Sequence, residues 1–119
     1  MAMCEVVLCG ANAYEQKYYF NKEFDKIPDG VKDELHIICV LFTEEVGGVF
    51  TIGFERDGEL VFETRAADDD FLYDEIGAGL MVAKIRDTKQ ELMQSLSLYY
   101  RLIYLKESPE ELLKLLEEE

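Results

Sequence analysis

The segment 49–65 constrains the fold more than any other part of the sequence, because it predicts a β-hairpin. Large apolar residues alternate along its first half, at Phe50, Ile52 and Phe54, which places them on one face of a strand. The Asp-Gly pair at 57–58 is a preferred turn, because glycine adopts positive φ without a steric clash. We therefore expect strands at 49–54 and 59–65, with an apolar face that other elements must cover.

Two helical segments can supply that cover. Apolar residues spaced by three or four predict a helix from Gly30 to Glu45, capped by Asp29 and ended by the glycines at 47–48. A second, longer helical region is expected from Asp68 to about Lys106. The glycines at 77 and 79 should bend or interrupt it, because each costs about 1 kcal/mol relative to alanine in a helix interior.

The two ends of the chain add shorter elements. Residues 5–9 predict a strand that ends in a turn at 10–12. The segment 13–21 suits either a short helix or a strand, and its aromatic run leads us to favour the strand. A helix start at Ser108 predicts an acidic terminal helix at about 109–118.

These elements predict a single α+β domain that spans residues 1–119. It should contain a small antiparallel sheet of three or four strands with a central β-hairpin. Two main helices and a short C-terminal helix should pack against that sheet.

The charge of the chain restricts its partners. The formal net charge of −14 over 119 residues repels nucleic acid and anionic membranes, and it attracts basic partners. No run of apolar residues is long enough to cross a bilayer. An odd number of cysteines, at positions 4, 9 and 39, and an N-terminus unlike a signal peptide predict a cytoplasmic protein.

The cysteines and the single histidine are the first candidates for chemistry. Cys4, Cys9, His36 and Cys39 are residue types that bind zinc, and a thiol paired with His36 could act as a nucleophile. However, Cys4 and Cys9 lie five residues apart, so a strand would point them to opposite faces. We therefore favour apolar core positions for the thiols and keep His36 and Cys39 as weak metal candidates.

Carboxylates gather between residues 68 and 75 and could hold Mg²⁺ or Ca²⁺, so Asp68, Asp70 and Asp74 are further weak metal candidates. Their spacing matches no calcium loop. Acidic side chains near a helix N-terminus are instead typical of favourable interactions with the helix dipole. The Gly-Ala-Gly at 77–79 is too short for a phosphate loop, so we predict no cofactor, resident metal or catalytic residue.

The long helical region carries apolar residues around most of its circumference, and this pattern predicts self-association. Tyrosine is favoured at interfaces, because it buries a large area and keeps a polar end. Met93, Tyr100 and Tyr104 form a second apolar stripe on this region. They are the residues that we expect at the interface of a homodimer.

Four stretches of the sequence carry a resemblance to a known family: LCGAN at 8–12, KYYFN at 17–21, CVLFTEEVGG at 39–48 and FLYDEIG at 71–77. In this order they resemble a family of short acidic proteins from clostridial bacteria, classed as a domain of unknown function. The resemblance extends to about residue 106. It implies a bacterial one-domain protein and carries over no activity, cofactor or catalytic residue.

Three functions remain open at the level of sequence. The first is a non-enzymatic interaction or regulatory domain that forms a homodimer, and we favour it because no catalytic set converges. The second is an acidic mimic or inhibitor of a basic protein partner. The third is an enzyme for a small molecule that uses His36 and acidic residues. The sequence names no ligand or pathway.

Overall fold

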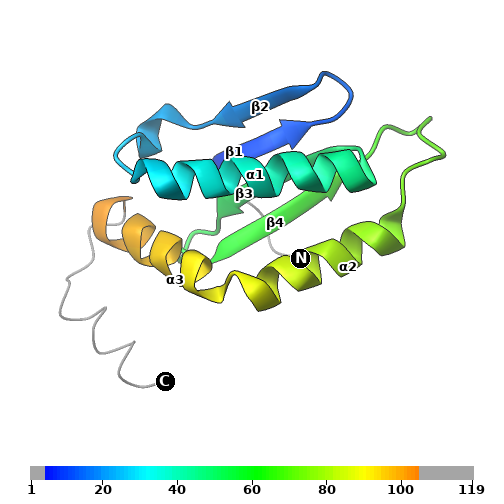
Figure 1. The fold of residues 1–119 in the computed structure, drawn as a ribbon. Coiled ribbons are helices and arrows are strands. Elements are labelled where there is room, and N and C mark those ends of the chain that lie inside the picture. The colour runs from blue at the N-terminus through cyan, green and yellow to red at the C-terminus, as the bar shows by residue number, and fades with distance from the viewer. Residues whose placement is uncertain (1–4, 105–119) are drawn as a thin grey trace.

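The structure, a computed structural model, describes residues 5–104, and the predicted helix at 109–118 lies outside this range. The elements in chain order are β1 (Val6–Asn12), β2 (Lys17–Phe20), the 3₁₀-helix η1 (Lys22–Phe24), α1 (Asp29–Val46), β3 (Val49–Phe54), β4 (Leu60–Arg65), α2 (Glu75–Thr88), α3 (Gln90–Tyr99) and the π-helix η2 (Tyr100–Tyr104). The strands form one antiparallel sheet in the order β2-β1-β3-β4. The helix α1 lies across the front of the sheet, and α2 and α3 continue below it beside β4 (Figure 1). The predicted α+β class and the small antiparallel sheet are confirmed.

The predicted hairpin forms as β3 and β4. Ile52 pairs with Phe62 and Phe54 with Leu60, so the apolar side chains of both strands share one face. Gly58 adopts a φ of 92° in the turn, as expected for the glycine of an Asp-Gly pair. The buried face lies against α1, where the ring of Phe50 stacks on that of Phe42 with centroids 4.2 Å apart.

The helix α1 matches its prediction to within one residue at each end, but its start differs in detail. Pro28 occupies the N-cap position and makes no side-chain capping bond, whereas Asp29 is already in the first turn. Gly47 ends the helix with a φ of 84°, and its N–H donates to the carbonyl of Thr43.

The strand β1 runs through the residues that were predicted as a turn. Gly10, Ala11 and Asn12 pair with both β2 and β3, and the chain turns instead at 13–16, where Gln16 has a φ of 53°. Glycine suits position 10 for a different reason, because a Cβ there would press on the carbonyl of Phe50. The favoured strand at 17–20 is confirmed as β2.

The long helical region is divided at a different place from the one predicted. Asp74 caps α2 by accepting the N–H of Gly77 at 2.9 Å, so the helix starts after the acidic segment and not at Asp68. The break falls at Lys89, whose Nζ forms a 2.8 Å ion pair with Glu34 of α1. The glycines at 77 and 79 lie within α2. The break allows the buried residues Ile85 and Leu96 to face the same core from two helices.

No helix within residues 5–104 combines the length and the hydrophobicity that a bilayer span requires.

Candidate functional site

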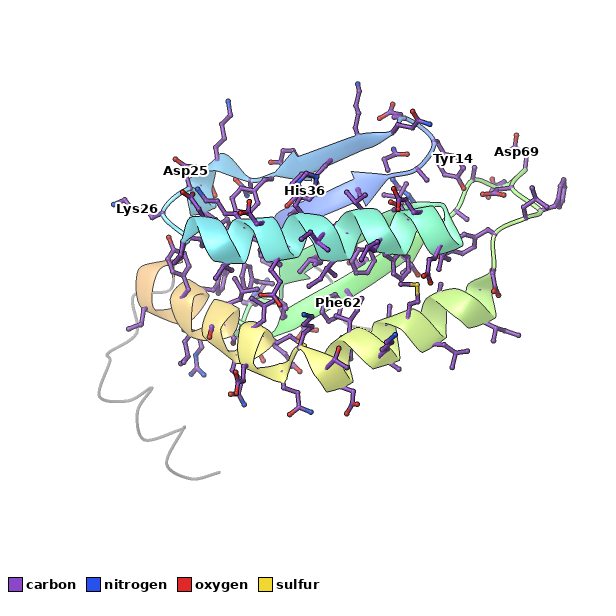
Figure 2. All side chains as sticks on the ribbon, viewed as in Figure 1. Tyr14, Asp25, Lys26, His36, Phe62 and Asp69 are labelled. Carbon is purple, nitrogen blue, oxygen red and sulfur yellow. The ribbon has the colours of Figure 1, made fainter. Side chains whose placement is uncertain are left out.

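A groove separates the β1–β2 hairpin from α1. It has a volume of about 610 Å³, and its lining residues are Ala11, Asn12, Ala13, Gln16, Lys17, Tyr18, His36, Val40, Thr43 and Glu44. His36 lies on the side of α1 that faces β2 (Figure 2). Its ring stacks on that of Tyr18, with centroids 4.2 Å apart and planes inclined by 23°.

Two thiols lie in the core beside this groove. The Sγ atoms of Cys9 and Cys39 are 3.8 Å apart, and both residues are fully buried. The hydrogen bond with Cys9 and burial raise the pKa of Cys39 well above its ordinary value. The Tyr18 hydroxyl is buried without a hydrogen-bond partner in the described part of the chain. Burial, followed by the nearby thiols, raises its pKa too.

His36 is therefore not brought together with Cys9 or Cys39 as a chemical site. His36 is exposed at the surface of α1, whereas Cys39, three residues later, faces the core. A protonated, buried thiol is a poor nucleophile and a poor metal ligand, which supports the core role that we favoured for Cys39. Cys4 lies outside the described residues.

We expect the free energy of unfolding to fall as the pH rises above the ordinary thiol pKa of about 8.5. Cys39 keeps its proton in the folded chain because its pKa is raised, whereas the unfolded chain loses that proton. A raised folded pKa contributes stability below the unfolded pKa and loses it above, by at most about 1.4 kcal/mol per pH unit. Urea unfolding at increasing pH measures this slope. The slope should be smaller in Cys39→Ala, and an equal slope would contradict a neutral buried thiol.

The acidic segment organises the chain before α2. The Tyr14 hydroxyl donates to Asp70 at 2.7 Å and accepts the N–H of Ala67 at 2.9 Å. The bond to Asp70 raises the pKa of Tyr14. Tyr14 thus ties the β1–β2 turn to the segment that contains Asp69 (Figure 2). Because Asp70 and Asp74 make local bonds and Asp68 is exposed, these carboxylates fit a structural role better than a metal site.

A second acidic group surrounds the hairpin turn, at Glu55, Asp57 and Glu59. Within residues 5–104, these are the three side chains whose carboxylate oxygens lie close enough together to hold a metal ion. The carboxylate of Asp57 accepts the N–H of Glu59 at 3.0 Å, which stabilises the turn. The turn was predicted from the sequence whereas the cluster was not, and the turn itself accounts for the position of these carboxylates.

Two of the three residues that were predicted for the interface, Met93 and Tyr100, contribute to the core. Tyr100 is only 2% exposed, and its ring stacks on that of Phe54 with centroids 4.4 Å apart. Met93 packs against the core and is partly buried. The side chain of Tyr104 lies outside the described part of the chain. Core packing thus accounts for Tyr100.

The most exposed large apolar side chains lie instead in the first half of α2 and in the segment just before it. Phe71 is 92% exposed, Leu72 94%, Ile76 78% and Leu80 67%. Helical spacing places Ile76, Gly79, Leu80 and Ala83 on one side of α2, which we call the outer face of α2. The buried Ala78 and Ile85 lie on the opposite side, so nothing in the described chain requires an apolar outer face.

Gly79 is a further feature of the outer face of α2 that the described fold does not require. A Cβ built at this position meets no atom within 4 Å, and the glycine costs about 1 kcal/mol relative to alanine in a helix interior. The described fold therefore does not explain why residue 79 is a glycine. The sequence signal that could have revealed this face is the spacing by four of Leu72, Ile76 and Leu80, which was not used in the prediction of the interface.

The sequence model described as a family of unknown function (DUF6145) matches residues 5–108. Neither a curated protein nor a solved structure shows significant similarity to this chain. Because the match covers most of the chain, the protein belongs to this family.

Proposed function

We propose that this member of DUF6145 is a non-enzymatic protein-interaction domain that acts as a homodimer, with the outer faces of two α2 helices in contact. The sequence pattern favours the bacterial cytoplasm as its location. The observation that carries the proposal is the self-complementarity of this face, which alternates large and small side chains along α2.

An antiparallel pair of α2 helices brings complementary residues together. When two copies cross near Gly79, Ile76 of one copy lies opposite Ala83 of the other. Small residues at the crossing allow the two helix axes to approach closely, as ridges-into-grooves packing requires.

The outer face of α2 offers apolar surface to such a dimer. Ile76 and Leu80 of each copy are strongly exposed, and burying each of these side chains contributes roughly 1.5–3 kcal/mol. Phe71 and Leu72, which are also exposed, lie just before α2. Repulsion between two chains of charge −14 is screened beyond about 8 Å at physiological ionic strength, so local contacts decide the outcome.

Substituting Gly79 with alanine tests the close approach of the helices. We expect Gly79→Ala to weaken dimerisation about tenfold or more, because an added methyl group in a close contact costs about 1–3 kcal/mol. The stability of the isolated chain should be equal or higher, because alanine favours the helix. Sedimentation equilibrium gives the dimer dissociation constant, and urea unfolding of the dilute chain gives the stability.

The matched control is Gly30→Ala. Gly30 lies in the first turn of α1, and a Cβ there also meets no atom within 4 Å. This variant should leave the dissociation constant unchanged. Equal dissociation constants for Gly79→Ala and the original chain would contradict close packing at this position.

A further inference from the structure

A second surface differs in position and chemistry from the outer face of α2. It begins at β2, which is an edge strand of the sheet. The N–H of Asn21 donates to the carbonyl of Leu8 on β1 at 2.8 Å. Because backbone groups alternate in direction along a strand, those of Tyr18 and Phe20 point away from β1 toward the open edge. No strand in the described part of the chain pairs with that edge.

The groove beside this edge continues onto α1. A shallow hollow of about 350 Å³ is lined by His36, Ile37, Val40, Leu41 and Glu44, and three of these residues also line the larger groove. Ile37 is 58% exposed and Leu41 is 50% exposed. Together with Val40 they form what we call the α1 ledge. The two hollows therefore adjoin, and Lys17 and Tyr18 of the edge strand β2 line the larger one.

We infer that these two adjoining hollows bind an extended, basic peptide segment of a partner protein, which adds to β2 as a further strand. This mode of recognition uses backbone hydrogen bonds for affinity and pockets for alternate side chains for specificity. The backbone groups of Tyr18 and Phe20 would pair with the peptide. One apolar side chain of the peptide would rest on the α1 ledge.

Charge selects a basic peptide over an acidic one. Asp33 and Glu44 are exposed on α1 on either side of Ile37, within a chain of net charge −14. Lys17 is a basic residue in the groove lining, and Glu44 lines the same groove. Basic side chains that flank an apolar one therefore match the carboxylates beside the ledge. This surface is independent of the homodimer, because it involves α1 and β2 and not α2.

A synthetic library of short peptides that vary in charge and hydrophobicity tests this inference. The protein should enrich peptides that combine lysine or arginine with an aliphatic residue. Binding of an enriched peptide should shift the backbone amide resonances of Tyr18 and Phe20. Methylating the peptide backbone nitrogens one at a time should weaken binding at alternate positions, because only alternate groups face β2.

A pair of leucine variants supplies the controls. Leu41→Lys should weaken peptide binding about tenfold or more, because it removes an apolar contact and adds a repelling charge. Leu80→Lys, on the outer face of α2, should leave peptide binding unchanged and disrupt the dimer instead. Enrichment of acidic peptides, absence of binding at millimolar peptide, or resonance shifts confined to β4 would overturn the inference. None of these outcomes depends on whether the homodimer forms.

Discussion

Replacing Leu35 with alanine is expected to lower the free energy of unfolding by about 2–5 kcal/mol, through lost burial and the cavity that remains. Leu35 is 1% exposed and belongs to the core that joins α1 to the sheet. The total stability of a domain is about 5–15 kcal/mol, so this single change removes a large part of it. Urea unfolding followed by circular dichroism measures the difference.

The same substitution at Leu41 is the matched control, because it lies on the same helix with half of its surface exposed. We expect Leu41→Ala to change the free energy of unfolding by less than about 1 kcal/mol. Equal losses for the two variants would show that α1 packs through a different face. They would also place the α1 ledge in the core, and the inferred peptide surface would then be wrong.

Replacing Ile76 with aspartate is expected to weaken dimerisation at least about a hundredfold. Each copy loses the burial of one large apolar side chain, worth about 1.5–3 kcal/mol, and the change occurs twice in a two-fold dimer. Each copy also places a carboxylate in an apolar contact. The monomer should still fold, because Ile76 is exposed and an aspartate near a helix N-terminus is favourable. Sedimentation equilibrium measures the dissociation constant.

Ile37→Asp is the control for this experiment. Ile37 is also an exposed isoleucine, but it lies on α1. We expect it to leave the dimer dissociation constant unchanged. If dimerisation persists in Ile76→Asp and is lost in Ile37→Asp, the interface lies on α1 instead. A dimer that resists both would place the interface outside these two faces.

Local patterns in the sequence were sufficient to predict much of the fold. The hairpin at 49–65 follows from alternation and an Asp-Gly turn, and α1 follows from apolar spacing with glycines at its end. Both signals depend on residues close together in the chain. The start of α2 was missed because Asp74 resembles its acidic neighbours, although it is the residue that caps Gly77.

Features that depend on tertiary contacts could not be predicted in this way. The strand β1 extends to Asn12 because β2 and β3 pair with it on both sides, which outweighs the turn propensity of Gly10. Tyr100 is buried because its ring meets Phe54, a residue far away in the sequence. The sequence shows that the α2–α3 region is apolar on several sides, and only the packing shows which side remains exposed.

An NMR spectrum that detects contacts only between isotope-labelled and unlabelled copies would test the homodimer most directly. We predict contacts between the methyl groups of Ile76 in one copy and Ala83 in the other, and contacts of Leu80 across the same two-fold axis. A monomeric chain, or intermolecular contacts confined to α1 or to the sheet, would contradict the proposed dimer.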